Sequence, residues 1–159
     1  TGLARGTLPG IGHESKKMVI ERDGSMEEIF TYGHYMRIYI RQARAKGVEV
    51  ILLSHTPANQ WENGKMKRCA QTYRKWTKEL AEQEMVHFVD LNDLTAGKFD
   101  LIGQENAKIY YKDLVHTSKE GAVMNAESVI EGISRLDECN LKKFLDSYYM
   151  SNLKVLSNE

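Results

Sequence analysis

Two short, largely apolar stretches constrain the fold of this chain more than any other feature. Residues 48–53 and 86–91 are dominated by Val, Ile, Leu and Phe, and each follows a segment with the pattern of a helix. Short apolar runs that follow a helix and a turn are typical of buried parallel strands. The alternation of helix and strand therefore predicts an α/β domain with a parallel sheet and helices on both faces, a three-layer α/β/α arrangement.

The rest of the sequence predicts more helices than a two-stranded sheet can bury on its faces. Ser25 and Glu28 form a capping-box pattern, which predicts a helix that runs to about Lys46 and ends at Gly47. We predict further helices over residues 65–84, 92–99, 117–136 and 141–150, and a short strand over 17–22. A two-stranded parallel sheet cannot bury the faces of about five helices. The chain also opens at Thr1 with neither a Met nor a signal-peptide pattern. We therefore expect the N-terminal strands of the sheet to lie outside these residues.

Composition excludes several functional classes. The 159 residues suffice for one domain, and 22 basic residues balance 22 acidic ones. A neutral chain without a basic cluster does not suit a nucleic-acid partner, and no apolar run is long enough for a membrane span. Cys69 and Cys139 make neither a disulfide-rich scaffold nor a complete zinc site. One disulfide and two free thiols both remain open.

The segment from Asp113 to Ser118 carries the clearest chemical pattern. A carboxylate three residues before a histidine can fold back and accept a hydrogen bond from one ring nitrogen. His116 would then keep its other nitrogen free as a general base, close to the start of a helix capped by Thr117 or Ser118. The alternative is an ordinary Asp in a turn before a helix, beside a partly exposed His.

Three further residues are candidates for substrate contacts. Asn59 and Trp61 lie in the loop after the first buried strand, where an indole can stack on a sugar ring and an amide can bond hydroxyls. Trp61 could equally pack on the domain. Thr31 could line the same cleft. Ser54 ends a buried strand and is the best-placed serine within this chain, but we do not expect it to be the nucleophile.

Several segments together carry a family resemblance. In chain order they are residues 5–12, 31–33 with 35–37, 43–47, 89–92, and 115–118 with Gly121, Ala122, Asn125 and Ala126. Together they resemble the rhamnogalacturonan acetylesterase group within the SGNH (GDSL-like) hydrolases, and the similarity extends over about residues 5–145.

The resemblance implies a flavodoxin-like SGNH hydrolase fold and a Ser-His-Asp triad. Asp113 and His116 match the Asp and His of that triad. The family's nucleophile lies in a Gly-Asp-Ser motif, and a Gly and an Asn help to form its oxyanion hole. This chain contains no Gly-Asp-Ser and no Gly-x-Asn-Asp. The family often carries an Arg in the loop where this chain has Ala58, Asn59 and Gln60, so a charged substrate contact there is not expected.

The leading hypothesis is that the 159 residues are a single, incomplete domain of a carbohydrate acetylesterase. Such an enzyme would remove acetyl groups from a plant cell-wall polysaccharide such as rhamnogalacturonan, in pectin degradation. The resemblance implies an acetylated oligo- or polysaccharide partner, no cofactor or metal, and a secreted or periplasmic location. We expect the chain alone to be inactive. The alternatives are a non-catalytic carbohydrate-binding or interaction module, or a chain that self-associates to complete its sheet.

Overall fold

A computed structural model describes residues 3–4, 6–68 and 71–145 of the chain. Its elements in chain order are β1 (Leu3–Ala4), β2 (Ser15–Ile20), β3 (Met26–Phe30), α1 (Tyr32–Ala45), β4 (Ile51–Leu53), β5 (Trp61–Glu62), β6 (Lys65–Met66), α2 (Tyr73–Glu84), β7 (His87–Val89), α3 (Leu91–Ala107), a 3-10 turn η1 (Lys108–Tyr110), α4 (Lys119–Ser134) and a second 3-10 turn η2 (Asn140–Phe144). The described part is therefore mixed α/β, as the sequence predicts.

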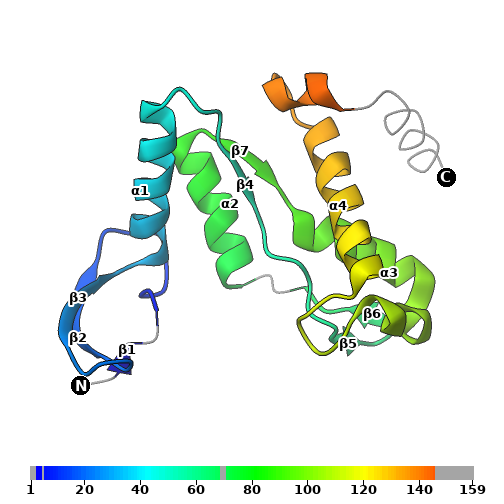
Figure 1. The fold of residues 1–159 in the computed structure, drawn as a ribbon, viewed down its shortest axis with the longest axis horizontal. Helices are drawn as coiled ribbons and strands as arrows, with labels where there is room; N and C mark the ends of the chain where they lie inside the picture. Colours follow the sequence, from blue (N-terminus) through cyan, green and yellow to red (C-terminus); the bar gives the residue numbers. More distant parts are fainter. Residues whose placement is uncertain (1–2, 5, 69–70, 146–159) are drawn as a thin grey trace.

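The two predicted buried strands pair with each other in parallel. β4 and β7 run side by side with Leu52 opposite Phe88. Alternate residues of a strand point to opposite faces of the sheet. Accordingly, Leu52 packs with Ile40 of α1 and Leu80 of α2. Ile51 and Val89 pack against α3 and α4 on the other face. In Figure 1 the strand pair lies between α1 and α2 on one side and α3 and α4 on the other.

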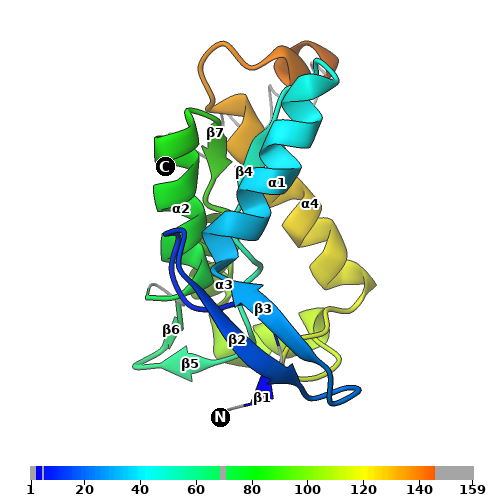
Figure 2. The same ribbon diagram turned by 90° about the vertical axis from the view of Figure 1, so that its left-hand side faces the viewer.

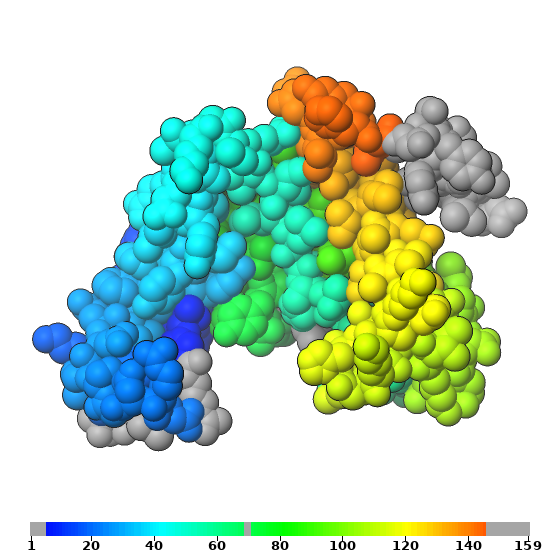
Figure 3. Space-filling view, in the orientation of Figure 1, coloured from blue at the N-terminus to red at the C-terminus, as the bar shows by residue number. Residues whose placement is uncertain are grey.

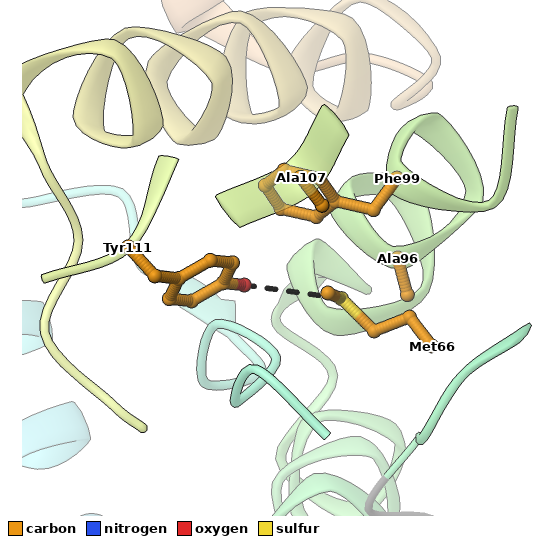
Figure 4. Packing of buried hydrophobic residues seen from close by; sticks show 5 residues of the cluster. All are labelled: Met66, Ala96, Phe99, Ala107 and Tyr111. Carbon is orange, nitrogen blue, oxygen red and sulfur yellow. Dashed lines mark hydrogen bonds between the residues drawn. The ribbon is translucent and has the colours of Figure 1, made fainter. Parts of the chain in front are cut away.

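A third core lies beyond the carboxyl ends of these strands. Met66 of β6, Phe99 of α3 and Tyr111 form its centre, with Ala96 and Ala107 filling the gaps. Figure 4 shows the phenol of Tyr111 pointing at Met66, and its oxygen lies 3.8 Å from the Met66 sulfur. This core joins the β5–β6 hairpin to α3 and to the segment that leads into Asp113. The sequence prediction placed a loop over the β5 half of this hairpin and the start of a helix over its β6 half.

The predicted start of the first helix was wrong. Residues 26–30 form strand β3, which pairs antiparallel with β2, and α1 starts only at Tyr32 with Thr31 as its N-cap. Asp23 accepts hydrogen bonds from the backbone N–H and the hydroxyl of Ser25, so Ser25 closes a turn and caps no helix. Figure 2 shows the β2–β3 hairpin projecting beyond the start of α1.

The predicted helix end at Gly47 is confirmed. α1 finishes at Ala45, and Gly47 takes a positive φ of 71°, a conformation that glycine adopts without steric cost.

Other helix boundaries shifted because tertiary contacts compete with local pattern. Residues 65–66 belong to β6, where the backbone N–H of Met66 donates to Asp100, so α2 begins eight residues later than predicted, at Tyr73. α3 extends to Ala107 through a non-helical Gly103. The predicted helix over 141–150 is the turn η2 as far as Phe144, and residues 146–150 lie outside the described part. None of the described helices combines the length and apolarity that a membrane span requires.

The packing between sheet and helices generates a stability prediction. Leu80 of α2 is fully buried against Leu52 and Ile40. Leu80→Ala should lower the free energy of unfolding by about 2–5 kcal/mol, through lost burial and the cavity that remains. Leu101→Ala is the matched control, because Leu101 is 88% exposed. Equal urea-unfolding midpoints for the two variants would contradict this packing.

Candidate active site

Asp113 and His116 occupy one closed turn immediately before α4. An isolated antiparallel bridge between Tyr111 and Thr117 closes the turn, and Lys112 N–H donates to the His116 carbonyl at 2.8 Å. Inside it, Asp113 Oδ1 accepts the backbone N–H groups of Val115 at 2.9 Å and His116 at 2.8 Å. Asp113 Oδ2 lies 2.7 Å from His116 Nδ1. The two residues are therefore brought together as the sequence predicts.

This arrangement prepares His116 for acid–base chemistry. The backbone N–H groups of His116 and Val115, with the His116 ring, lower the pKa of Asp113 to about 2. Asp113 is therefore an acceptor at neutral pH, and His116 Nδ1 carries the proton between them. The basic lone pair then resides on Nε2, which no described residue contacts. The His116 side chain is 74% exposed, so Nε2 is open to a reacting group.

The loop after β4 and the Tyr111 segment hold the turn in place. Tyr111 is buried, and its hydroxyl donates to the Pro57 carbonyl at 2.9 Å. Burial raises the pKa of Tyr111 to about 12, so this donor stays protonated. Asn59 N–H donates to the carbonyl of Leu114, between Asp113 and His116, at 2.8 Å.

At the start of α4, a Cβ at Gly121 would lie 2.1 Å from the Tyr110 carbonyl oxygen. This close approach requires glycine. Ser118 N–H also donates to that carbonyl, and its hydroxyl accepts from Gly121 N–H. Ser118 is therefore the helix cap, one of the two residues that the sequence suggested.

Asn59 and Trp61 lie beside the turn but contact each other. The Trp61 indole N–H donates to Asn59 Oδ1 at 2.9 Å. Trp61 is half-buried and packs against the core of Met66 and Tyr111. Only the outer part of this pair is therefore available for a sugar, and the packing role that the sequence left open is present.

Thr31 is not brought to the turn. Its hydroxyl donates to the Gly12 carbonyl at 2.5 Å and accepts from His34 N–H at 3.1 Å, and only 1% of the residue is exposed. Thr31 caps α1. Figure 3 shows a wide hollow between the N-terminal hairpin and the lobe that carries the start of α4. A substrate contact through the Thr31 side chain therefore finds no support in its exposure or its bonding.

A buried polar network at the carboxyl ends of β4 and β7 was missed by the sequence analysis. Ser54 is 2% exposed; its hydroxyl donates to Asp90 and accepts from the Asn92 N–H, both at 2.9 Å. Arg74 of α2 makes a two-pronged ion pair with Asp90. The available signal was the position of Asp90 directly after a buried strand.

This bonding removes Ser54 as a candidate nucleophile, because its hydroxyl is buried and fully engaged. Burial tends to raise the pKa of Asp90, but the hydrogen bonds from Arg74 and Ser54 outweigh it and lower the pKa. Burial lowers the pKa of the neighbouring His55, and the Arg74 charge adds to that effect. The Asp90 carboxylate therefore stays ionised at neutral pH, and its charge is paired with the Arg74 guanidinium.

Comparisons with known proteins connect the turn to esterases. No family model matches the chain. A rhamnogalacturonan acetylesterase from Emericella nidulans is 27% identical over 130 residues, covering 81% of this chain and 52% of that protein. A probable rhamnogalacturonan acetylesterase from Bacillus subtilis, YesY, is 30% identical over 116 residues, or 69% of this chain and 54% of that protein. This chain thus spans about half the length of both relatives.

A solved structure supports the same relationship. The crystal structure of YxiM from Bacillus subtilis matches with a TM-score of 0.59 at 30% identity, over 64% of this chain and 30% of that one. YxiM is also described as an uncharacterized esterase.

These matches show distant homology between part of this chain and esterases of the SGNH hydrolase group. Within that group, the homologous proteins include rhamnogalacturonan acetylesterases, as the resemblance of the sequence implied.

The geometry of the turn predicts how Asp113 titrates. Its carboxyl carbon, followed by NMR, should titrate near pH 2 instead of the ordinary 3.8. Because the folded-state pKa is lowered, its stabilising contribution is complete above about pH 4 and is lost as pH falls toward 2. His116→Ala should raise the Asp113 pKa only in part, since both backbone donors remain. Asp23, which forms a similar turn with Ser25, should not respond; an ordinary Asp113 titration would contradict the closed turn.

The position of Thr31 predicts a structural effect on substitution. Thr31→Ala should lower the free energy of unfolding by about 0.5–2 kcal/mol, because the N-cap hydrogen bond of α1 is lost. Thr31→Ser keeps a hydroxyl and should retain most of that stability. Thermal or urea unfolding measures both variants, and equal stability of Thr31→Ala and the unchanged protein would refute the capping role.

Proposed function

We propose that this chain carries the Asp and His of a Ser-His-Asp triad in a carbohydrate acetylesterase with a flavodoxin-like SGNH fold. The single observation that carries the proposal is the 2.7 Å contact between Asp113 Oδ2 and His116 Nδ1 in a turn that leaves Nε2 exposed. Homology to rhamnogalacturonan acetylesterases supports the same assignment.

The proposed reaction uses His116 first as base and then as acid. As a serine hydroxyl attacks the acetyl carbonyl, Nε2 takes its proton, and the imidazolium then passes that proton to the departing sugar oxygen. The acetyl group remains on the serine as an ester. Water, deprotonated by the same Nε2, hydrolyses the ester to acetate and regenerates the serine. Asp113 keeps Nδ1 protonated and stabilises the imidazolium in both steps.

The nucleophile and the oxyanion donors belong, in this proposal, to a segment outside these residues. The chain contains no Gly-Asp-Ser and no Gly-x-Asn-Asp, and Ser54 is buried and engaged. The parallel sheet of the described part has two strands only, and β4 has one ladder partner, β7. We propose that further strands pair with the other side of β4. A second copy of the chain is the alternative source of those strands.

The hollow between the start of α1 and the start of α4 fits this arrangement. It opens at the carboxyl ends of β4 and β7, the edge where ligands bind in parallel α/β sheets. A serine at the carboxyl end of an added parallel strand next to β4 would lie at the same edge of the sheet as Asp90. The reacting ester would then lie in the hollow with His116 on one wall.

The proposed substrate is an acetylated plant cell-wall polysaccharide of the rhamnogalacturonan type. Two relatives are described as rhamnogalacturonan acetylesterases, one of them as probable. The exposed part of Trp61 and the Asn59 amide lie next to the turn, where a sugar ring of the polymer would pass. Because such polymers lie outside cells, we propose a secreted or periplasmic location. The reaction consumes only water and calls for no cofactor.

The test is acetate release from acetylated rhamnogalacturonan by the protein expressed from its gene, with any upstream coding sequence included. His116→Ala and Asp113→Asn should each lower kcat by at least about a thousandfold. Asp23→Asn is the matched control, because Asp23 is an exposed turn carboxylate in the β2–β3 hairpin. Full activity of His116→Ala would refute the proposed triad.

The 159 residues by themselves should hydrolyse little aryl acetate. Turnover by this chain that His116→Ala abolishes would contradict an external nucleophile. Saturable binding without hydrolysis by the gene's complete product, lost in Trp61→Ala, would instead support the carbohydrate-binding module.

A further inference from the structure

Three side chains with metal-ligating atoms meet at the opposite end of the parallel strands. Glu49 lies just before β4, His87 is the first residue of β7, and Cys139 comes after α4, directly before η2. One ligand atom from each residue lies within 4.8 Å of the other two. In Figure 1 this end of the strands lies toward the top of the view, near the orange segment that contains η2. The cluster is therefore remote from Asp113 and His116.

The separations fit the first coordination shell of a small ion. His87 Nε2 lies 3.5 Å from Glu49 Oε1, and Cys139 Sγ lies 3.9 Å from Glu49 Oε2. In a tetrahedral zinc site, metal–ligand bonds of about 2.0–2.3 Å place neighbouring ligand atoms about 3.3–3.8 Å apart. The two separations that involve Glu49 are close to this range, and the ligand atoms of His87 and Cys139 lie within 4.8 Å of each other.

The backbone fixes the ligands in this position. Asn140 N–H donates to both Glu49 oxygens, at 3.2 and 3.1 Å, and so orients the carboxylate toward Cys139. Val89, in the same strand as His87, packs in one core cluster with Cys139 and Ile133. Hydrogen bonds of this kind from outside the ligand set orient metal ligands and raise affinity.

The ligand types select the ion. A thiolate and an imidazole favour zinc-class ions over Mg²⁺ or Ca²⁺, which prefer oxygen ligands. A Cys thiolate, a Glu carboxylate and a neutral His carry two negative charges in total, which balance one divalent cation. Without an ion, the buried Cys139 thiol has only a weak 3.9 Å contact with a carboxylate that His87 also engages.

Access and local charge also permit an ion to bind. A surface hollow of about 320 Å³ is lined by Glu49 and His87, together with Arg44, Val48, Val50, Met85 and Val86. Both Glu49 and His87 keep 29% of their side chains exposed. The Arg44 charge in this hollow opposes a cation, but its guanidinium is engaged by Glu84 and by the carbonyls of Glu84 and Met85.

We propose that Glu49, His87 and Cys139 form a binding site for one Zn²⁺ ion. Water takes the fourth position, on the side of the hollow, and Cys139 loses its proton when the metal binds. The ion joins the amino ends of β4 and β7 to the segment after α4. This inference does not depend on the proposed esterase function.

Titration of the untagged, reduced chain with ZnCl₂, followed by calorimetry, should give one equivalent bound. Replacement of the metal by Co²⁺ should produce a thiolate-to-cobalt charge-transfer band in the near ultraviolet. Zn²⁺ should raise the thermal unfolding midpoint, because it binds the folded chain. Absence of both saturable binding and the cobalt band would overturn the proposal.

Variants distinguish this site from adventitious binding. Cys139→Ser should abolish the cobalt band, and His87→Gln and Glu49→Gln should each lower Zn²⁺ affinity at least tenfold. Cys69→Ser and His13→Gln are matched controls for the thiol and the imidazole, and both should bind Zn²⁺ like the unchanged chain. Far-ultraviolet circular dichroism without metal checks that each variant folds, and Gln at position 49 can still accept the Asn140 hydrogen bond. Retained affinity in folded His87→Gln and Glu49→Gln, or loss of binding in Cys69→Ser, would refute this ligand set.

Discussion

The parallel pairing of β4 with β7 is the interaction on which the rest of the structure depends. It places Leu52 on one face and Val89 on the other, and thereby creates two separate helix-packing surfaces. It also brings the carboxyl ends of the two strands together at one edge of the sheet and their amino ends together at the other. Ser54 and Asp90 meet at the carboxyl ends, whereas Glu49 and His87 meet at the amino ends. Both polar clusters are thus consequences of one strand register.

The Asp113–His116 turn shows how an exposed site can still be well ordered. The two side chains are more than half exposed, yet their backbone is fixed from both sides. Tyr111 anchors it to Pro57 in the loop after β4, and Asn59 N–H holds the Leu114 carbonyl. Buried contacts outside the turn thus supply the rigidity, and the imidazole remains accessible. This division suits a general base that has to reach a hydroxyl on another part of the fold.

Sequence reasoning succeeded where the determining contacts are local. The end of α1 at Gly47 and the cap of α4 at Ser118 depend on neighbouring residues, and both agree with the pattern. The prediction was wrong over residues 25–30. Ser25 forms a turn with Asp23, and the next five residues pair with β2 as an antiparallel strand. The prediction also placed the start of α2 eight residues too early. Met66 belongs to β6, and its backbone N–H donates to Asp100, which lies 34 residues away. In the first failure a competing turn and the neighbouring strand outweighed the helix pattern, and in the second a partner distant in the sequence did so.

The sequence by itself determined the α/β class, the two buried strands and the Asp113–His116 pair. Each of these rests on a local pattern, whose residues lie close together along the chain. Only the tertiary structure decided that Thr31 caps a helix, that Trp61 binds Asn59 and packs on a core, and that Glu49, His87 and Cys139 converge. Glu49, His87 and Cys139 lie far apart in the sequence, the Thr31 hydroxyl also donates to the Gly12 carbonyl, and Trp61 packs on the core of Met66 and Tyr111. The physical reason is that burial is a property of the folded chain. A local sequence pattern does not determine which distant residues a side chain will contact.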